Sequence, residues 1–259
     1  MLLQDKVIII SGVGAGMGRR MAKLASAEGA KVGLASRNSA YIKSIAKEIK
    51  DLGGEAIACS TDITRSEDCY KLAKKVKERF GRIDGLVNSA YQHGDWATTD
   101  IADVDKWADT YNVNCIGALR MAQAVLPYMK SNSGGAIVNV STMTTVTPFP
   151  GEASYAASKG GLNVLTKHMA KDFGRFGIRV NLCRMGWIGG APVYGYIDAQ
   201  VNNGRKRDDV INEITDRIPL GIIPPEEDCA KAVLYFVSDY ARVVTGATLD
   251  VNGGQYMAP

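Results

Sequence analysis

Tyr155 and Lys159 are the residues of this 259-residue chain whose types and spacing could do chemistry. They lie near the start of segment 152–173, whose residue pattern predicts a helix. Side chains four positions apart share a helical face, so we expect the phenol and the ammonium to point into one cavity. A nearby cation favours ionisation of a phenol, so the pair is predicted to exchange protons with a substrate oxygen near neutral pH. The spacing alone also fits a lysine that merely runs along its own helix.

Composition excludes several classes of function. Hydrophobic residues at 46% and charged residues at 22% are ordinary for a soluble globular protein. The net charge of +4 is mild and the basic residues are scattered, which argues against nucleic acid as a partner. The five cysteines are widely spaced without a C-x-x-C, as expected of reduced thiols, and no apolar run is long enough for a signal peptide or a membrane span. We therefore expect a cytoplasmic protein, and its two histidines without a ligand cluster predict no metal site.

A glycine-rich turn follows the first apolar run. Segment 6–11 reads as a strand, segment 19–28 as a helix, and the sequence between them is Gly-Val-Gly-Ala-Gly-Met-Gly. Such a turn lets backbone N–H groups at a helix start approach a pyrophosphate, with glycines wherever a Cβ would collide. Glycine-rich turns also occur for purely structural reasons. The residues of this turn predicted to bind a cofactor are Gly12, Val13, Gly16, Met17 and Gly18.

Strand and helix patterns then alternate, which implies a parallel sheet. Further strands are predicted at 31–35, 55–59, 83–87, 136–140, 178–183 and 248–251, and further helices at 39–52, 66–80, 103–130, 152–173 and 226–238. The pattern loosens over 186–220, and we expect this segment to be a substrate lid within a single domain spanning 1–259.

Ser36 and Arg37 follow the second predicted strand, where an NAD-binding protein usually places an acid for the ribose 2′-hydroxyl. A carboxylate there would repel a 2′-phosphate, whereas a hydroxyl and a guanidinium would hold one. This pair therefore predicts NADP(H) rather than NAD(H). The alternative is that Arg37 is a solvated loop charge.

Other polar and small residues follow the third and fourth strands. Asp62 and Ile63 could flank an adenine, although Asp62 could equally be a turn or cap residue. Asn88 and Ala90 end the fourth strand, where open α/β sheets bind their ligands. Asn114 lies among apolar residues of segment 103–130, so its amide must be hydrogen-bonded. It either locks the helix or holds a water.

In order and spacing, these motifs closely resemble the short-chain dehydrogenase/reductase family, in its shorter single-domain branch, from about residue 6 to 256. The family's glycine turn corresponds to residues 11–18, its Asn-Asn-Ala-Gly to the altered 88–91, its helix-borne asparagine to Asn114, and its Tyr-x-x-x-Lys to Tyr155 and Lys159. The resemblance implies that Tyr155 protonates the substrate oxygen and that Lys159 also binds the nicotinamide ribose. It further implies that Asn114 holds a water linking Lys159 to solvent.

Departures from the family pattern concern the substrate and nicotinamide ends. The position of the family's catalytic serine falls on Thr142, with Ser141 immediately before it, and a threonine keeps a hydroxyl of similar reach. The usual Pro-Gly is Met-Gly186, and the threonine that helps hold the nicotinamide amide is replaced by Gly190, although the Ile188 backbone can still contribute. Tyr91 replaces a glycine beside the nicotinamide site, which either rearranges the backbone or adds an aromatic wall.

We therefore predict a Rossmann-type doubly wound α/β fold, with a central seven-stranded parallel sheet and helices on both faces. The predicted activity is NADP(H)-dependent interconversion of a ketone or aldehyde and an alcohol, on a small and possibly cyclic or aromatic substrate. The alternatives are an NAD-dependent alcohol dehydrogenase of the same fold, an epimerase or dehydratase, and a catalytically silent nucleotide-binding protein. The resemblance also implies a homo-oligomer, a tetramer paired through segments 103–130 and 152–173. Both segments carry small residues that permit close approach of a partner helix, namely Gly117, Ala118, Gly160 and Gly161. Aromatic residues predicted to line the substrate site are Tyr91, Trp96, Phe149, Trp187, Tyr194 and Tyr196.

Overall fold

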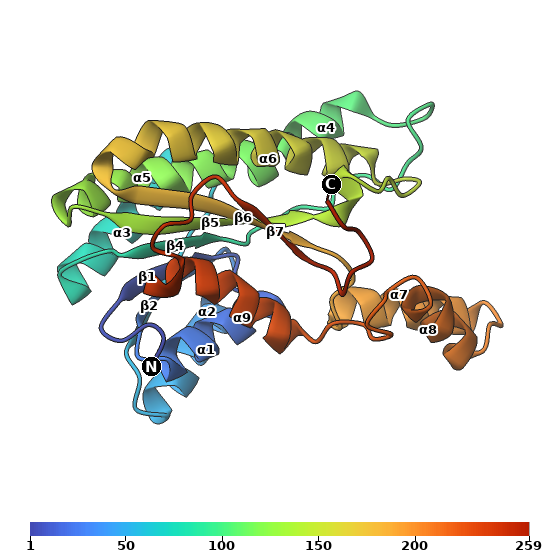
Figure 1. The fold of residues 1–259 in the computed structure, drawn as a ribbon, viewed down its shortest axis with the longest axis horizontal. Coiled ribbons are helices and arrows are strands. Elements are labelled where there is room, and N and C mark those ends of the chain that lie inside the picture. The colour runs from blue at the N-terminus through green and yellow to red at the C-terminus, as the bar shows by residue number, and fades with distance from the viewer. Residues whose placement is uncertain (259) are drawn as a thin grey trace.

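A seven-stranded parallel sheet forms the centre of the computed structural model, which describes residues 1–258 (Figure 1). The strand order is β3-β2-β1-β4-β5-β6-β7, and every neighbouring pair is parallel. The strands are β1 (Val7–Ser11), β2 (Lys31–Ser36), β3 (Ala56–Ser60), β4 (Gly85–Asn88), β5 (Gly135–Thr142), β6 (Ile178–Met185) and β7 (Thr248–Val251). The predicted sheet is confirmed, and all carboxyl ends lie along one edge.

Helices cover both faces of the sheet (Figure 1). One face carries α1 (Met17–Ala27), α2 (Ser39–Asp51) and α9 (Glu226–Val237), and the other carries α3 (Ser66–Phe80), α5 (Gly117–Ser131) and α6 (Ala153–Phe173), with α4 (Val104–Tyr111) packed on α6. The predicted doubly wound architecture is therefore also confirmed.

The strand β1 supplies apolar side chains to both layers. Ile8 and Ile10 belong to the core under α1, α2 and α9, whereas Val7 and Ile9 belong to the core under α3, α5 and α6. Successive side chains of a strand point to opposite faces, so a strand covered on both sides must be apolar throughout. This is why the short β-branched runs of the sequence mark the strands so clearly.

The predicted helix 103–130 is interrupted by a π-helical segment, Asn112–Ile116, between α4 and α5. A π-turn holds one more residue than an α-turn and shifts the following helix face. The shift turns Asn114 into the interior, where it is 1% exposed. Apolar periodicity alone gave no sign of this insertion.

Segment 186–220 is more ordered than its sequence pattern indicated. It contains α7 (Ala191–Asn202) and α8 (Arg207–Thr215), which project from the body of the molecule beside the carboxyl ends of the strands (Figure 1). These helices share a small apolar cluster, separate from the two main cores, formed by Ile197, Val210, Ile214 and Ile218. Ile197 is the one fully buried residue of α7, so the apolar stripe is too narrow to produce a clear helical pattern.

The five cysteines are buried and unpaired. Within residues 1–258, no helix has the length and apolar character needed to cross a bilayer.

Candidate active site

The helix α6 brings Tyr155 and Lys159 together, as their spacing predicted. Lys159 is 2% exposed, and its Nζ donates a hydrogen bond of 2.8 Å to the carbonyl oxygen of Val140 on β5. The same Nζ lies 6.0 Å from the centroid of the partly exposed Tyr155 ring. Both side chains therefore face the carboxyl end of β5.

The electrostatics of this pair differ from our expectation. Burial raises the pKa of the Tyr155 phenol, and the neighbouring Tyr91 and Glu152 raise it further, whereas the nearby Thr142 hydroxyl lowers it. Burial also lowers the pKa of Lys159 to about 8. The prediction that the Lys159 cation makes the phenol more acidic is thus wrong here, because desolvation disfavours both charged forms. Tyr155 is held as a neutral phenol, the form that can give a proton.

The hydroxyls of Ser141 and Thr142 point to different partners. Ser141 is 2% exposed, and its Oγ donates a 2.6 Å hydrogen bond to Oδ1 of Asn163 on α6. Thr142 ends β5 with its hydroxyl beside the Tyr155 phenol. The Ser141 hydroxyl is therefore occupied by Asn163, and Thr142 at the end of the strand provides the hydroxyl beside the phenol.

The side-chain amide of Asn114 forms hydrogen bonds to other residues of the protein. Its Oδ1 accepts a hydrogen bond from the Gln92 N–H, and its Nδ2 donates to the Gln92 carbonyl, both at 2.7 Å. The second Nδ2 proton goes to Ser158 Oγ at 2.9 Å. Of the two roles left open by the sequence, the structure favours the locking one: Asn114 joins the loop after β4 to α6.

Asn88, the last residue of β4, is buried and links the strands to the helices next to the site. Its Nδ2 donates to the Ala118 carbonyl at 3.2 Å and to Asn139 Oδ1 at 2.9 Å, and Asn139 Nδ2 donates to Thr166 Oγ1 at 2.9 Å. This buried chain runs from β4 through β5 into α6. Asn88 therefore positions the elements of the site rather than lining an open surface.

The glycine turn fits the pyrophosphate of a dinucleotide. Gly12 has φ of +89°, and a Cβ there would lie 2.2 Å from the Ala90 nitrogen, so only glycine lets the turn pack on the loop after β4. The N–H groups of Gly12 and Val13 donate to the Ala35 carbonyl. Among the described residues, the N–H groups of Met17 and Gly18 at the start of α1 have no acceptor. Free donors at a helix start are what a phosphate requires, so within this turn the N–H groups of Met17 and Gly18 are the ones available to a ligand, whereas those of Gly12 and Val13 are used within the protein.

Ser36 and Arg37 lie at the carboxyl end of β2. Ser36 Oγ accepts a 3.3 Å hydrogen bond from the Asn38 N–H, and the Arg37 carbonyl accepts one from Ser60 Oγ. The Arg37 side chain is exposed, and within residues 1–258 no carboxylate lies close enough to form an ion pair with it. A free guanidinium at this corner suits a phosphate ligand.

Asp62 and Ile63 serve the protein's own packing. Asp62 Oδ1 accepts hydrogen bonds from the N–H and the hydroxyl of Thr64 at 2.9 and 2.8 Å, and these bonds lower the pKa of Asp62. Ile63 packs against Gly117 on α5. The turn role that the sequence left open for Asp62 is the one observed, while an adenine contact stays a prediction.

An aromatic group beside Tyr155 was only partly foreseen. The His93 ring stacks on Trp96 at 3.8 Å and on Tyr155 at 4.7 Å between centroids, and Tyr91 lies 6.0 Å from Tyr155. His93 Nε2 is 3.4 Å from Glu152 Oε1. Glu152 was not among the predicted site residues. Its position three residues before Tyr155, at the start of the same helix, is the sequence signal that could have indicated it.

The loop after β6 bounds the site on the other side. The Gly186 N–H donates to the Val251 carbonyl at 3.1 Å, and a Cβ on Gly186 would collide with Asn252. The Ile188 carbonyl accepts from the Gly190 N–H at 2.7 Å. Of the predicted cofactor residues, Gly186 and Ile188 thus lie far from the Arg37 corner, with the glycine turn between the two groups.

Comparison with known proteins places this geometry in a family. Residues 12–255 match the family model described as enoyl-(acyl carrier protein) reductase. The chain is 33% identical to an uncharacterized oxidoreductase of Thermotoga maritima, over 98% of both chains, and 32% identical to the 3-oxoacyl-acyl-carrier-protein reductase FabG of the same organism, over 98% of this chain and 99% of that protein. A structure of a short-chain type dehydrogenase/reductase from Mycobacterium ulcerans superimposes with a TM-score of 0.89 at 25% identity, covering 98% of this chain and 91% of that one.

The buried Lys159 predicts a pH-dependent stability. In the unfolded chain the Lys159 ammonium keeps its proton up to about pH 10.5, whereas in the folded protein it gives up the proton near pH 8. Between these values the unfolded state binds more protons, so the contribution of Lys159 to stability rises with pH. We expect the difference in free energy of unfolding between the unmodified protein and Lys159→Met to be flat below pH 8 and to grow in favour of the unmodified protein up to pH 10.5.

Chemical denaturation across this pH range measures the difference. Lys50→Met is the control, because that side chain is exposed at the end of α2. A pH-independent difference for Lys159→Met would mean that the buried lysine stays charged.

Proposed function

The chain belongs to the short-chain dehydrogenase/reductase family, and we propose that it is an NADP(H)-dependent oxidoreductase that interconverts a carbonyl compound and an alcohol. The observation that carries this proposal is the convergence of Tyr155, Lys159 and the Thr142 hydroxyl at the carboxyl end of β5, where Lys159 Nζ donates a 2.8 Å hydrogen bond to the Val140 carbonyl and lies 6.0 Å from the Tyr155 ring centroid. The Thr142 and Tyr155 hydroxyls can both form a hydrogen bond to the same substrate oxygen, and Tyr155 can give that oxygen a proton.

In the reductive direction Tyr155 is the acid. Its raised pKa keeps the phenol protonated at neutral pH, and Thr142 orients the substrate oxygen toward it. Lys159, with a pKa of about 8, can pass a proton near neutral pH and binds the nicotinamide ribose. Asn114 acts as a positioning residue through Gln92 and Ser158. The nicotinamide cofactor supplies the hydride chemistry when bound.

The proposed preference for NADP(H) over NAD(H) rests on the Arg37 corner. An exposed guanidinium without an ion pair and the Ser36 hydroxyl offer charge-assisted and neutral hydrogen bonds to a 2′-phosphate. No carboxylate replaces Ser36 to receive a ribose hydroxyl. The NAD-dependent dehydrogenase is therefore the second candidate.

The substrate proposed is a small carbonyl compound with a flat or cyclic body. Tyr91, His93 and Trp96 form an aromatic wall beside Tyr155. In the segment after β6, Trp187 packs on Tyr196 of α7 at 5.6 Å between ring centroids. We propose that segment 186–220, which has its own apolar cluster, closes as a lid within a single domain.

A catalytically silent nucleotide-binding protein is the alternative of another class. The altered serine, proline and asparagine motifs favour it, whereas the Thr142 hydroxyl placed beside Tyr155 argues against it. NADPH absorbance followed against a panel of cyclic and aromatic ketones and aldehydes discriminates the two. Tight cofactor binding without any turnover would favour the silent protein.

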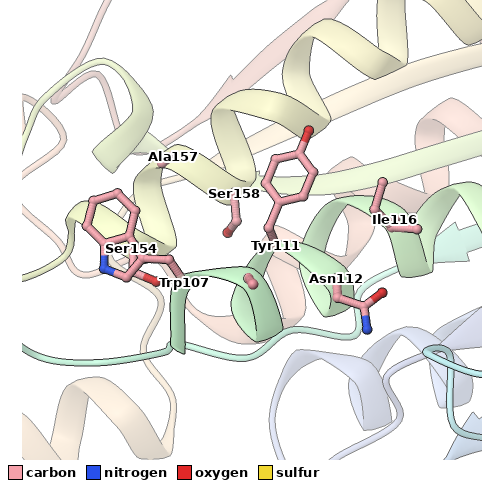
Figure 2. Close-up of a pocket in the computed structure, with 8 residues that line it drawn as sticks. Trp107, Tyr111, Asn112, Ile116, Ser154, Ala157 and Ser158 are labelled. Atoms are coloured by element: carbon pink, nitrogen blue, oxygen red, sulfur yellow. The ribbon is translucent and has the colours of Figure 1, made fainter. Parts of the chain in front are cut away.

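We also propose a homo-oligomer paired through α4 and α6. Between these helices lies a cavity of ≈420 Å³, and all of its lining residues come from α4, α6 and the π-helical segment (Figure 2). A stripe of small and apolar residues continues along α6, with Ala157 and Val164 exposed and Gly160 partly exposed between them. The expectation that Gly117, Ala118 and Gly161 also admit a partner helix is wrong, because Gly117 and Ala118 are buried and Tyr111 of the same chain covers Gly161. Of the predicted small residues, Gly160 alone has open space at its Cβ position.

Removing the phenol oxygen tests the proposed acid. Tyr155→Phe is expected to lower kcat by about 10² to 10⁴-fold while leaving the Kd for NADPH nearly unchanged, because general acid catalysis contributes about that much. Retention of a tenth of the rate would exclude Tyr155 from this role.

The two neighbouring hydroxyls give a matched pair of variants. Thr142→Ala is expected to lower kcat about 10²-fold, since it removes one oriented hydrogen-bond donor, while Thr142→Ser has a mild effect. Ser141→Ala should lower stability and leave kcat nearly unchanged, because Ser141 bonds Asn163. The reverse pattern would assign the role to Ser141.

Cofactor preference is tested at Arg37. Charge-assisted hydrogen bonds contribute about 1.5 to 3 kcal/mol, which predicts a preference for NADPH over NADH between about tenfold and a few hundredfold in kcat/KM. Arg37→Ala should erase most of it, and Ser36→Asp should reverse it. Lys50→Ala removes the same charge from the far end of α2 and should change nothing. Equal kcat/KM with both cofactors in the unmodified enzyme would refute the NADP(H) assignment.

Light scattering with a charged substitution tests the oligomer. Val164 is 59% exposed in the middle of the α6 stripe, so Val164→Lys should convert a tetramer into smaller species by burying an unpaired charge. Leu52→Lys, at an 81% exposed position after α2, is the control and should leave the mass unchanged. A concentration-independent monomer in the unmodified protein would contradict the proposal.

A further inference from the structure

Glu226, the first residue of α9, extends its carboxylate between two glycines that start other helices. A Cβ on Gly190 would lie 2.1 Å from Glu226 Oε1, and a Cβ on Gly16 would lie 2.9 Å from the same oxygen. Gly16 begins α1 and Gly190 begins α7. The carboxylate therefore fills the space that a side chain at position 190 would need, directly beside the glycine turn.

This carboxylate has little to hold it within the protein. Its side chain is 13% exposed, and its one ion pair is a contact of 3.7 Å from Oε2 to Nε of the half-exposed Arg20. No donor in residues 1–258 gives it a hydrogen bond. A shielded carboxylate without donors is costly, so a ligand that brings a donor would be bound strongly.

The sheet order determines which half of a dinucleotide reaches Glu226. The pyrophosphate belongs at the start of α1, and the adenosine half extends toward β2, where Arg37 lies. β6 lies on the opposite side of β1 from β2, and Gly190 follows β6. Glu226 thus lies on the side of the glycine turn that the nicotinamide half occupies on its way to Tyr155.

We propose that Glu226 binds the nicotinamide half of the cofactor, its carboxylate accepting a hydrogen bond from the carboxamide N–H₂ or from a hydroxyl of the adjacent ribose. This inference rests on the proposed function, because it requires a nicotinamide dinucleotide at the site. Phosphates carry no donor and would be repelled, so only the nicotinamide half offers a favourable partner.

The charge of Glu226 gives the proposal a distinctive consequence. The oxidised nicotinamide ring carries a positive charge and the reduced ring does not, whereas both forms carry the same pyrophosphate. A nearby carboxylate therefore favours binding of NADP⁺ over NADPH, and any repulsion from the phosphates cancels in the ratio of the two dissociation constants.

Isothermal titration of the intact protein with NADP⁺ and NADPH tests this. Glu226→Gln keeps the shape and an acceptor oxygen but removes the charge. We expect it to weaken NADP⁺ binding about tenfold and NADPH binding by about threefold or less, because it converts a charge-assisted hydrogen bond into a neutral one. With the 3-acetylpyridine analogue of NADP⁺, which lacks the amide N–H₂, the effect should shrink if the carboxamide is the donor and persist if a ribose hydroxyl is.

Two control variants separate this role from general charge effects. Glu227→Gln makes the same charge change at the next residue, whose side chain is 53% exposed, and should leave both dissociation constants unchanged. Arg20→Gln removes the ion pair with Glu226 but keeps the Glu226 carboxylate. It should also leave the ratio of the NADP⁺ and NADPH dissociation constants unchanged. Thermal unfolding verifies that each variant is folded.

Several results would overturn the inference. Tighter binding of both cofactor forms by Glu226→Gln would mean that the carboxylate faces the phosphates. The inference would also be rejected if Glu226→Gln left the ratio of the NADP⁺ and NADPH dissociation constants unchanged, or if Arg20→Gln changed this ratio by the same factor. If the unmodified protein bound neither cofactor form, the proposed function itself would fail, which is a distinct outcome.

Discussion

The candidate site depends on the attachment of α6 to the carboxyl end of β5. Three successive β5 residues bond this helix: Asn139 donates to Thr166, the Val140 carbonyl accepts from Lys159, and Ser141 donates to Asn163. These contacts are shielded from water, where losing one hydrogen-bonding partner costs about 1 to 3 kcal/mol. They fix the helix against the strand and so fix Tyr155 against Thr142, the next residue along β5.

Burial has opposite effects on the pKa values of the two titratable residues. It raises the pKa of Tyr155 and lowers that of Lys159, so burial favours the neutral form of both side chains. A neutral phenol beside a second hydroxyl suits proton donation to a carbonyl oxygen. The His93 ring contributes to the burial of Tyr155, because it stacks on the Tyr155 ring and is itself covered by Trp96. The same aromatic packing that surrounds the Tyr155 ring therefore helps to keep its phenol in the neutral form.

The cofactor surface divides at the glycine turn. Toward β2 the protein presents the free cation of Arg37, and toward β6 it presents the carboxylate of Glu226. Free N–H groups of α1 lie between them. This order of charge, positive then dipolar then negative, matches a ligand with a phosphate at one end and hydrogen-bond donors at the other. It comes from residues in three separate parts of the chain.

The sequence by itself determined the fold, because strands buried on both faces must be apolar throughout and the helices between them follow one-sided patterns. It also determined the glycine turn and the approach of Tyr155 to Lys159, since both depend on local spacing. Only the tertiary structure decided that Thr142 rather than Ser141 meets the phenol, that Asn114 is locked by Gln92 and Ser158, and that Glu226 reaches Gly190. The tertiary structure likewise decided the direction in which the pKa values of Tyr155 and Lys159 are shifted. Each of these depends on desolvation or on partners distant in sequence, and local spacing carries no information about either.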